Sequence, residues 1–178
     1  MERPTVQPNG AENSLENLSK TFAAGGISPD NFLDKVLELD QADRERKSSL
    51  LAAEILSQPE IVEAFQETQD RTKFYSIRSL TFFHKAQIRL SKGEADVKDD
   101  FERALHDSLE VGPQNEDWAN YIRATIAYLD GDLDSLRGLS EKIHLNKSLV
   151  QNFVKGLEER GHPDYLADYS KEREPDQM

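Results

Sequence analysis

The chain has 178 residues, no cysteine and a formal net charge of -12 at pH 7, from 34 acidic and 22 basic side chains. Without cysteine it has no disulfide, thiolate metal site or cysteine nucleophile. Its acidity argues against nucleic acid and anionic membranes as partners, because both repel negative charge. We find neither a signal-peptide core nor a run of ~20 apolar residues that could cross a bilayer, so we expect a cytoplasmic protein.

Apolar residues recur at three- and four-residue steps along most of the chain, which is typical of amphipathic α-helices. Glycine, proline, serine and aspartate stand between the periodic segments, where they cap and end helices. In chain order, the pattern predicts helices over residues 14–24, 28–39, 43–56, 59–65, 74–90, 94–110, 117–130, 133–143, 149–157 and 163–169. We therefore expect an all-α protein.

The ends of the chain are polar. We expect residues 1–27 to be a flexible leader, residues 28–170 to form a single α-helical domain, and residues 171–178 to be a disordered charged tail. The leader contains one segment, 14–24, that can form a short helix. Such a helix is marginal alone, so it either docks on a partner or frays, and we favour the flexible alternative. Its apolar residues are Leu15, Leu18 and Phe22.

Two neighbouring segments differ in character. Residues 66–72 contain no apolar side chain, so they form either a turn or an exposed stretch of helix, and whether 59–91 is one helix or two stays open. Residues 74–90 carry apolar side chains on most sides of the predicted helix. A helix of that kind is buried between neighbours, so we expect it at the centre of the fold.

The segment that follows residue 117 is the most regular part of the chain. Trp118, Tyr121 and Ile122 begin an apolar stripe that continues to Leu129. Gly131 then ends the helix, because glycine adopts the left-handed conformation of a C-terminal cap at little cost. An aspartate after it can cap a second helix. The unit is therefore two helices that fold against each other.

Three glycines, Gly93, Gly131 and Gly161, lie between paired helices at spacings that bracket the ~34-residue period of helical-hairpin repeats. The sequence of residues 124–132, Ala-Thr-Ile-Ala-Tyr-Leu-Asp-Gly-Asp, resembles the hairpin turn of a tetratricopeptide repeat. Residues 93–105, with a proline after them, resemble its second helix. The partial match, over roughly residues 74–143, implies a right-handed array of antiparallel helical hairpins that binds proteins or peptides in a groove.

On that geometry, Trp118, Tyr121 and Tyr128 of the helix over 117–130 face the groove, and Asn120 and Arg123 flank it. Large amphipathic aromatic side chains commonly anchor interfaces, and the asparagine and arginine can bind a peptide backbone or carboxylate. The alternative is that Trp118 and Tyr121 are core and only Tyr128 is exposed. We favour core for Trp118 and leave the tyrosines open.

The loop after this helix has the acidic spacing of an EF-hand calcium site, with Asp130, Asp132, Asp134 and Glu141. Two positions depart from that motif, because Ser135 replaces the required glycine and Arg137 replaces an aliphatic residue. Aspartates also cap helix starts and favour their positive end. We therefore favour helix capping over calcium, and expect no metal or cofactor.

No nucleophile elbow, phosphate loop or dinucleotide fingerprint occurs, and the four histidines form no His-x-x-x-His pair. We therefore expect a non-enzymatic protein- or peptide-binding module, an adaptor or scaffold. One alternative is a small helical enzyme or ligand-binding bundle with a pocket lined by Phe82, Phe83, His84 and Tyr128. Another is a homo-oligomer that buries its apolar excess between copies.

Overall fold

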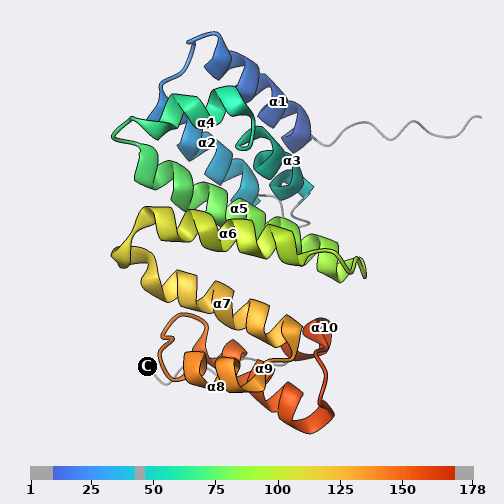
Figure 1. Ribbon diagram of the computed structural model, residues 1–178. Helices are drawn as coiled ribbons and strands as arrows, with labels where there is room; N and C mark the ends of the chain where they lie inside the picture. Colours follow the sequence, from blue (N-terminus) through green and yellow to red (C-terminus); the bar gives the residue numbers. More distant parts are fainter. Residues whose placement is uncertain (1–9, 43–46, 171–178) are drawn as a thin grey trace, which may run out of the picture.

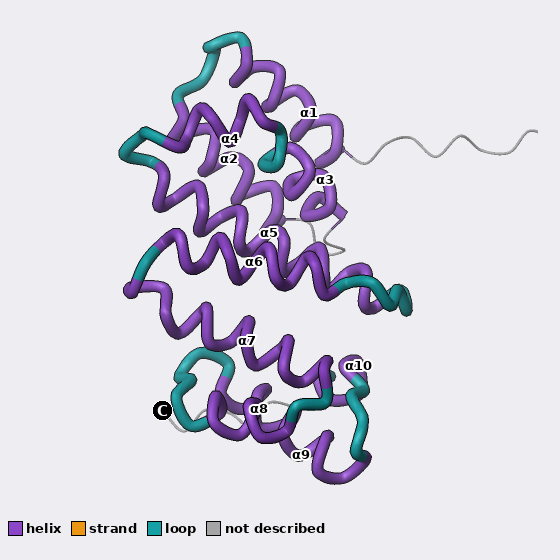
Figure 2. The backbone as a smooth tube through the Cα atoms, in the orientation of Figure 1, coloured by secondary structure: helices purple, strands orange, loops and turns teal. Residues whose placement is uncertain are grey.

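A computed structural model describes residues 10–42 and 47–170 of the chain. These residues contain no strand (Figure 2), so the all-α class is confirmed. The helices are α1 (Gly10–Ala23), α2 (Pro29–Ala42), α3 (Lys47–Ile55), α4 (Pro59–Gln66), α5 (Arg71–Ser91), α6 (Lys98–Val111), the 3-10 turn η1 (Pro113–Asn115), α7 (Glu116–Asp130), α8 (Leu133–Ser140), α9 (Lys147–Arg160) and α10 (Tyr165–Tyr169).

The helices form a stack with α5 and α6 side by side across its middle (Figure 1). On one side of α5 lie α1, α2, α3 and α4. On the other side of α6 lies α7, followed by α8, α9 and α10. Besides α6, α5 contacts α2, α3 and α4, which explains why its apolar residues lie on most of its sides. The predicted central helix is confirmed.

Turns in the structure settle the helix boundaries that the sequence left open. Residues 67–70 separate α4 from α5, so residues 59–91 are two helices. Pro59 begins α4 at a position where its missing N–H breaks no hydrogen bond. Gly131 ends α7 in the left-handed conformation, with φ 71°, and Gly161 ends α9 in the same way, with φ 73°. Both helix ends were predicted.

Buried side chains form two clusters. The N-terminal core comes mainly from α1 to α5, and the C-terminal core mainly from α5 to α10. One helix, α5, belongs to both: its first half supplies Phe74 and Ile77 to the N-terminal core, and its second half supplies Phe82 and Phe83 to the C-terminal core. The two cores are therefore joined through α5, which packs into both of them.

The first helix is part of this fold. Leu15 of α1 is completely buried, and the ring of Phe22 stacks on Phe32 at 4.4 Å and on Phe65 at 5.6 Å between ring centroids. The prediction of a flexible leader up to residue 27 is therefore wrong for α1, because contacts with α2 and α3 stabilise a helix that would be marginal alone. Residues 1–9 and 171–178 lie outside the described residues.

Ion pairs fix α5 against α6. The buried carboxylate of Asp100 on α6 lies 3.0 Å from Lys85 Nζ and 2.7 Å from Arg89 Nη1 of α5. About two turns further along α6, buried Asp107 accepts two hydrogen bonds from Arg78 of α5. Each of the two buried carboxylates of α6 is thus neutralised by cations of α5, and these contacts hold α6 against α5.

Candidate functional site

The two tyrosines of the predicted binding stripe are core residues. Tyr121 is 2% exposed and Tyr128 is fully buried. Tyr121 packs against Phe83 and Trp118, with ring centroids 5.3 and 5.6 Å away, and Tyr128 stacks on Phe153 at 4.4 Å. The expectation that they face an open groove is wrong. Phe83 of α5 covers Tyr121, and Phe153 of α9 covers Tyr128.

Trp118 is half-buried and links three helices. Its indole Nε1 on α7 donates to Ser79 Oγ of α5 at 2.9 Å, and Ser79 Oγ donates to the carbonyl oxygen of Ala104 on α6 at 2.7 Å. This agrees with the core position that we favoured for Trp118. Its hydrogen bond and its packing thus link α7 to α5 and α6.

The hydroxyl of Tyr128 anchors α10. It donates to Asp168 Oδ2 at 2.6 Å and accepts a hydrogen bond from the Asp164 backbone N–H, also at 2.6 Å. Arg160 forms an ion pair with the same Asp168 carboxylate. Burial and the Asp168 carboxylate both raise the pKa of Tyr128. This cluster is internal, and its role is to attach α10 to α7 and α9.

Asn120 and Arg123 form a pair at the edge of the core. Asn120 is 9% exposed, and its Oδ1 accepts a hydrogen bond from Arg123 Nη1 at 2.9 Å. Arg123 is half-buried and reaches a surface groove. Of the five residues that the sequence suggested for binding, Arg123 is the one that lines an open groove.

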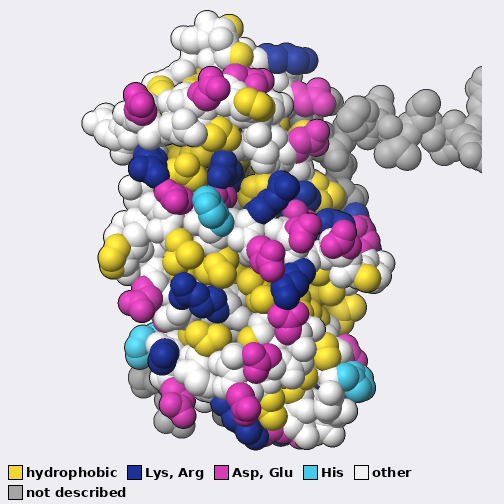
Figure 3. Space-filling model, in the orientation of Figure 1, with side chains coloured by type: hydrophobic (Ala, Val, Ile, Leu, Met, Phe, Trp, Pro, Cys, Tyr) yellow, Lys and Arg dark blue, Asp and Glu magenta, His cyan; other side chains and the backbone are white. Residues whose placement is uncertain are grey.

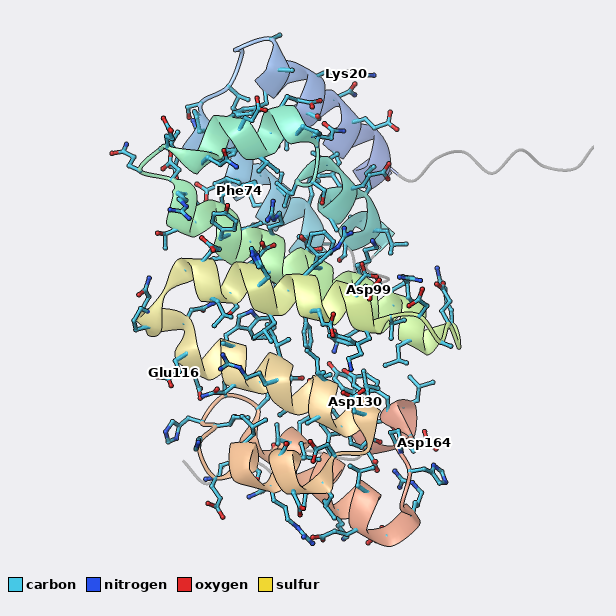
Figure 4. All side chains as sticks on the ribbon, in the orientation of Figure 1. Lys20, Phe74, Asp99, Glu116, Asp130 and Asp164 are labelled. Atoms are coloured by element: carbon cyan, nitrogen blue, oxygen red, sulfur yellow. The ribbon has the colours of Figure 1, made fainter. Side chains whose placement is uncertain are left out.

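That depression, which we call the α6–α7 groove, has a volume of about 380 Å³ and is lined by Ser108, Leu109, Gly112, Pro113, Glu116, Ala119 and Arg123. Leu109 is 52% exposed, so a large apolar side chain of the groove faces solvent. Hydrophobic side chains gather on this face between α6 and α7, beside basic ones (Figure 3). Glu116, at the start of α7, marks one end of the groove (Figure 4).

The groove was not predicted, because Leu109 has the sequence pattern of a buried helix position. The residue does follow the apolar period of residues 94–110, but α6 points that edge outward. A Gly112–Pro113 turn separates α6 from α7, and both of its residues line the groove with Leu109. A sequence pattern predicts which face of a helix is apolar. The neighbouring helices decide which residues at the edge of that face remain exposed to solvent.

A second depression lies on the opposite flank of α6. This α5–α6 hollow has a volume of about 240 Å³ and is lined by Ser57, Arg78, Phe82, Arg103, His106 and Asp107. Arg78 Nε and Nη2 donate to Asp107 Oδ2 and Oδ1 at 2.7 and 2.5 Å. No sequence motif pointed to this hollow, because its residues come from α5, α6 and the turn after α3.

The acidic loop is a helix cap. Asp132 Oδ1 accepts a hydrogen bond from Ser135 N at 3.1 Å, and hydrogen bonds from Ser135 lower the pKa of Asp132. Asp130 pairs with Lys98 at 2.7 Å, while Asp134 and Glu141 are exposed. Nowhere in residues 10–42 and 47–170 do three or more potential metal ligands of the His, Cys, Asp or Glu type gather. The predicted cap is confirmed for Asp132.

Three of the four residues suggested for the pocket of the enzyme alternative line neither the α6–α7 groove nor the α5–α6 hollow. Phe83 packs on Trp118, His84 Nδ1 lies 2.9 Å from Asp40 Oδ2, and Tyr128 packs on Phe153. Phe83 and Tyr128 therefore belong to the C-terminal core, whereas His84 pairs with Asp40. The fourth residue of that set, Phe82, contributes to the α5–α6 hollow.

One polar cluster contains the residue types of a serine hydrolase. The buried Asp40 carboxylate contacts His84 and also accepts a hydrogen bond from Ser49 Oγ. Both contacts end on the aspartate, so the serine is not bonded to the histidine that would have to act as its base. The cluster joins α2, α3 and α5 and offers no activated nucleophile.

No family model matches the chain, and searches of curated proteins and of solved structures give no significant match. In the described part of the chain, no helix is long and apolar enough to cross a membrane. Two surface depressions flank α6: the α6–α7 groove and the α5–α6 hollow. They are the candidate binding sites of the protein.

Proposed function

We propose that this protein is a non-enzymatic binding module that holds a short extended segment of a partner protein in the α6–α7 groove. The observation that carries the proposal is the position of Leu109 and Arg123 on the two walls of one groove. Exposed apolar surface inside a depression is typical of binding sites. An interaction protein of this kind needs no cofactor.

The groove indicates the chemistry of the segment. Leu109, Pro113 and Ala119 offer an apolar surface to one aliphatic or aromatic side chain. Arg123 has no acidic partner among residues 10–42 and 47–170, and the bond to Asn120 orients its guanidinium. Its remaining N–H donors suit a carboxylate. We infer a segment with an apolar residue close to an acidic side chain or a C-terminal carboxylate.

We also infer that α5 to α8 form two right-handed antiparallel hairpins of the tetratricopeptide kind. Support comes from the contacts of each helix with the next and from the left-handed glycine after α7. The proposed groove departs from the family, because it lies between α6 and α7 and not along the first helices alone. A partner that is neither nucleic acid nor membrane belongs to this proposal and rests on the acidic charge. A cytoplasmic location also belongs to it, and the absence of cysteine fits a reducing compartment.

A peptide-library selection against the full-length protein tests this function. The affinities of selected peptides are then measured for the wild type and for L109D and R123Q. We expect both variants to weaken binding about tenfold or more, because each removes a central contact. Leu166 provides a matched control, since it is equally exposed, at 52%, on α10. L166D should bind like the wild type.

Peptides that bind L109D and R123Q as tightly as the wild type would contradict the groove assignment. Sedimentation of all variants checks the competing occupant, a second copy of the chain. If the wild type is a dimer and L109D is a monomer, the groove is a self-association surface and the peptide proposal is wrong. Circular dichroism confirms that each variant keeps its helices.

A further inference from the structure

The α5–α6 hollow has a charge balance unlike that of the whole chain. Its lining includes Arg78, Arg103 and His106 but only one carboxylate, Asp107. The chain as a whole has 34 acidic and 22 basic side chains. A depression that collects cationic side chains on an acidic protein is a local exception, and it points to an anionic ligand.

Arg78 is fixed in place and still has donors to offer. Its side chain is 14% exposed, and its guanidinium lies 5.0 Å from the ring centroids of both Phe74 and Tyr75. A guanidinium carries five N–H groups, and Asp107 accepts hydrogen bonds from Nε and Nη2. The donors on Nη1 stay available to a ligand in the hollow, and little side-chain entropy is lost on binding.

Arg103 supplies a charge that is not neutralised. It has no acidic partner among residues 10–42 and 47–170, and its guanidinium lies 5.7 Å from the ring centroid of Phe82, the apolar side chain of the hollow. His106 is 71% exposed, with Nδ1 3.6 Å from Asp107 Oδ1. Three donor-bearing side chains thus surround one depression, and Asp107 balances only one of the two arginines.

We propose that the α5–α6 hollow binds the phosphoryl group of a phosphorylated side chain in the partner segment. A phosphoryl group presents three strong acceptor oxygens and nearly two negative charges at neutral pH, which match the donors of Arg78, Arg103 and His106. A carboxylate presents two oxygens and one charge. The net charge of -12 repels a long acidic tract, so a single concentrated charge is the better ligand.

The hollow and the α6–α7 groove flank the same exposed ridge of α6. His106 lines the hollow and Leu109 lines the groove, and residues three apart are neighbours on a helix surface. A peptide that crosses the ridge spans about 10 Å, the width of a helix, or about three extended residues. The phosphorylated residue then lies about three positions from the apolar one. This spacing rests on the proposed function of the groove, whereas the phosphoryl site does not.

Inorganic phosphate is the first probe. It is titrated into isotope-labelled full-length protein at constant ionic strength, with chloride and acetate as reference anions, while amide chemical shifts are recorded. We expect saturable shifts around Arg78, Arg103 and His106 with phosphate only. R103Q should weaken phosphate binding about tenfold or more. K155Q, which removes an exposed charge from α9, should leave phosphate binding unchanged.

Equal shifts with phosphate and chloride would overturn the site, and equal affinity for acetate would make it a carboxylate site. An R103Q variant that binds phosphate like the wild type would also refute the assignment, provided that its spectrum shows a folded protein. R103K keeps the positive charge but replaces the planar guanidinium, with its five N–H donors, by a single ammonium group. Intermediate affinity for this variant supports recognition through several hydrogen bonds.

The second probe is a synthetic peptide with leucine three positions from phosphoserine, compared with its unphosphorylated form. We expect the phosphopeptide to bind more tightly than inorganic phosphate, and to lose affinity with R103Q and with L109D. If L109D has no effect while R103Q does, the groove proposal fails and the phosphoryl site stands. A phosphopeptide that binds no better than inorganic phosphate makes the ligand a small phosphorylated molecule and overturns the assignment to a partner protein.

Discussion

The indole Nε1 of Trp118 donates to Ser79 Oγ at 2.9 Å, and the same hydroxyl donates to Ala104 O at 2.7 Å. Ser79 is completely buried. One hydroxyl group therefore joins α7, α5 and α6 in the part of the stack that carries both surface depressions. The position of the α6 ridge between its neighbours depends on this contact.

Replacing Ser79 by alanine should lower the free energy of unfolding by about 2 kcal/mol, because a buried indole N–H and a carbonyl oxygen lose their partner. Urea denaturation followed by Trp118 fluorescence measures the change. S91A is the control, since Ser91 is exposed and bonds only to the carbonyl oxygen of Ile88 in its own helix. Equal stability of the two variants would show that the Ser79 bridge contributes little.

Two helical glycines should respond to alanine in opposite directions. A β-carbon at Gly156 would overlap the buried Asp168 carboxylate, which Tyr128 and Arg160 hold in place. G156A should therefore lose about 2 kcal/mol through overpacking. No atom lies within 4 Å of a β-carbon at Gly138, so G138A should gain about 0.5 kcal/mol from helix propensity. Thermal unfolding measures both, and a stable G156A would mean that α10 moves away at little cost.

Tyr128 should make stability fall in alkaline solution. Its pKa is raised in the folded state above the unfolded value of about 10, so its contribution is complete below pH ~10 and is lost as the pH rises further. Y128F should cost about 2 kcal/mol at pH ~8, because its hydroxyl bonds are lost. The difference between wild type and Y128F should shrink above pH ~10. A constant difference in urea denaturation would contradict this assignment.

The cap on α8 should show the opposite pH dependence. Because the pKa of Asp132 is lowered in the folded state, its contribution is present above the unfolded pKa of about 4 and is lost as the pH falls through the folded pKa. D132A should lower the melting temperature at neutral pH, and the effect should vanish in acid. D134A is the matched control, because Asp134 is fully exposed beside it and accepts no bond at the cap.

Helix type and helix ends were largely readable from the sequence, because they depend on local chemistry. Gly131 had to adopt a left-handed conformation, and apolar residues on most sides of residues 74–90 required neighbours on most sides. Tertiary relationships were not readable. The docking of Phe22 depends on Phe32 and Phe65, which belong to other helices, and no local pattern reports such a contact.

The candidate site was predicted only in part for a related reason. Tyrosine suits both cores and interfaces, so the stripe of α7 could not show that Tyr121 and Tyr128 point inward. Arg123 was identified because the resemblance to a tetratricopeptide repeat places it beside the groove, where its guanidinium can bind a carboxylate. Leu109, across the groove from Arg123, lies at an apolar position of the helical period and is nevertheless exposed. Its exposure depends on how α6 and α7 pack, which the sequence pattern does not report.

Because α5 supplies Phe74 to one core and Phe83 to the other, a cut on either side of α5 removes an aromatic side chain from one of the cores. A fragment that stops before α5, or one that begins after it, would leave an aromatic-lined surface open to water. Limited proteolysis in the α4–α5 or α5–α6 turn should therefore yield fragments that stay associated, or that aggregate once they separate.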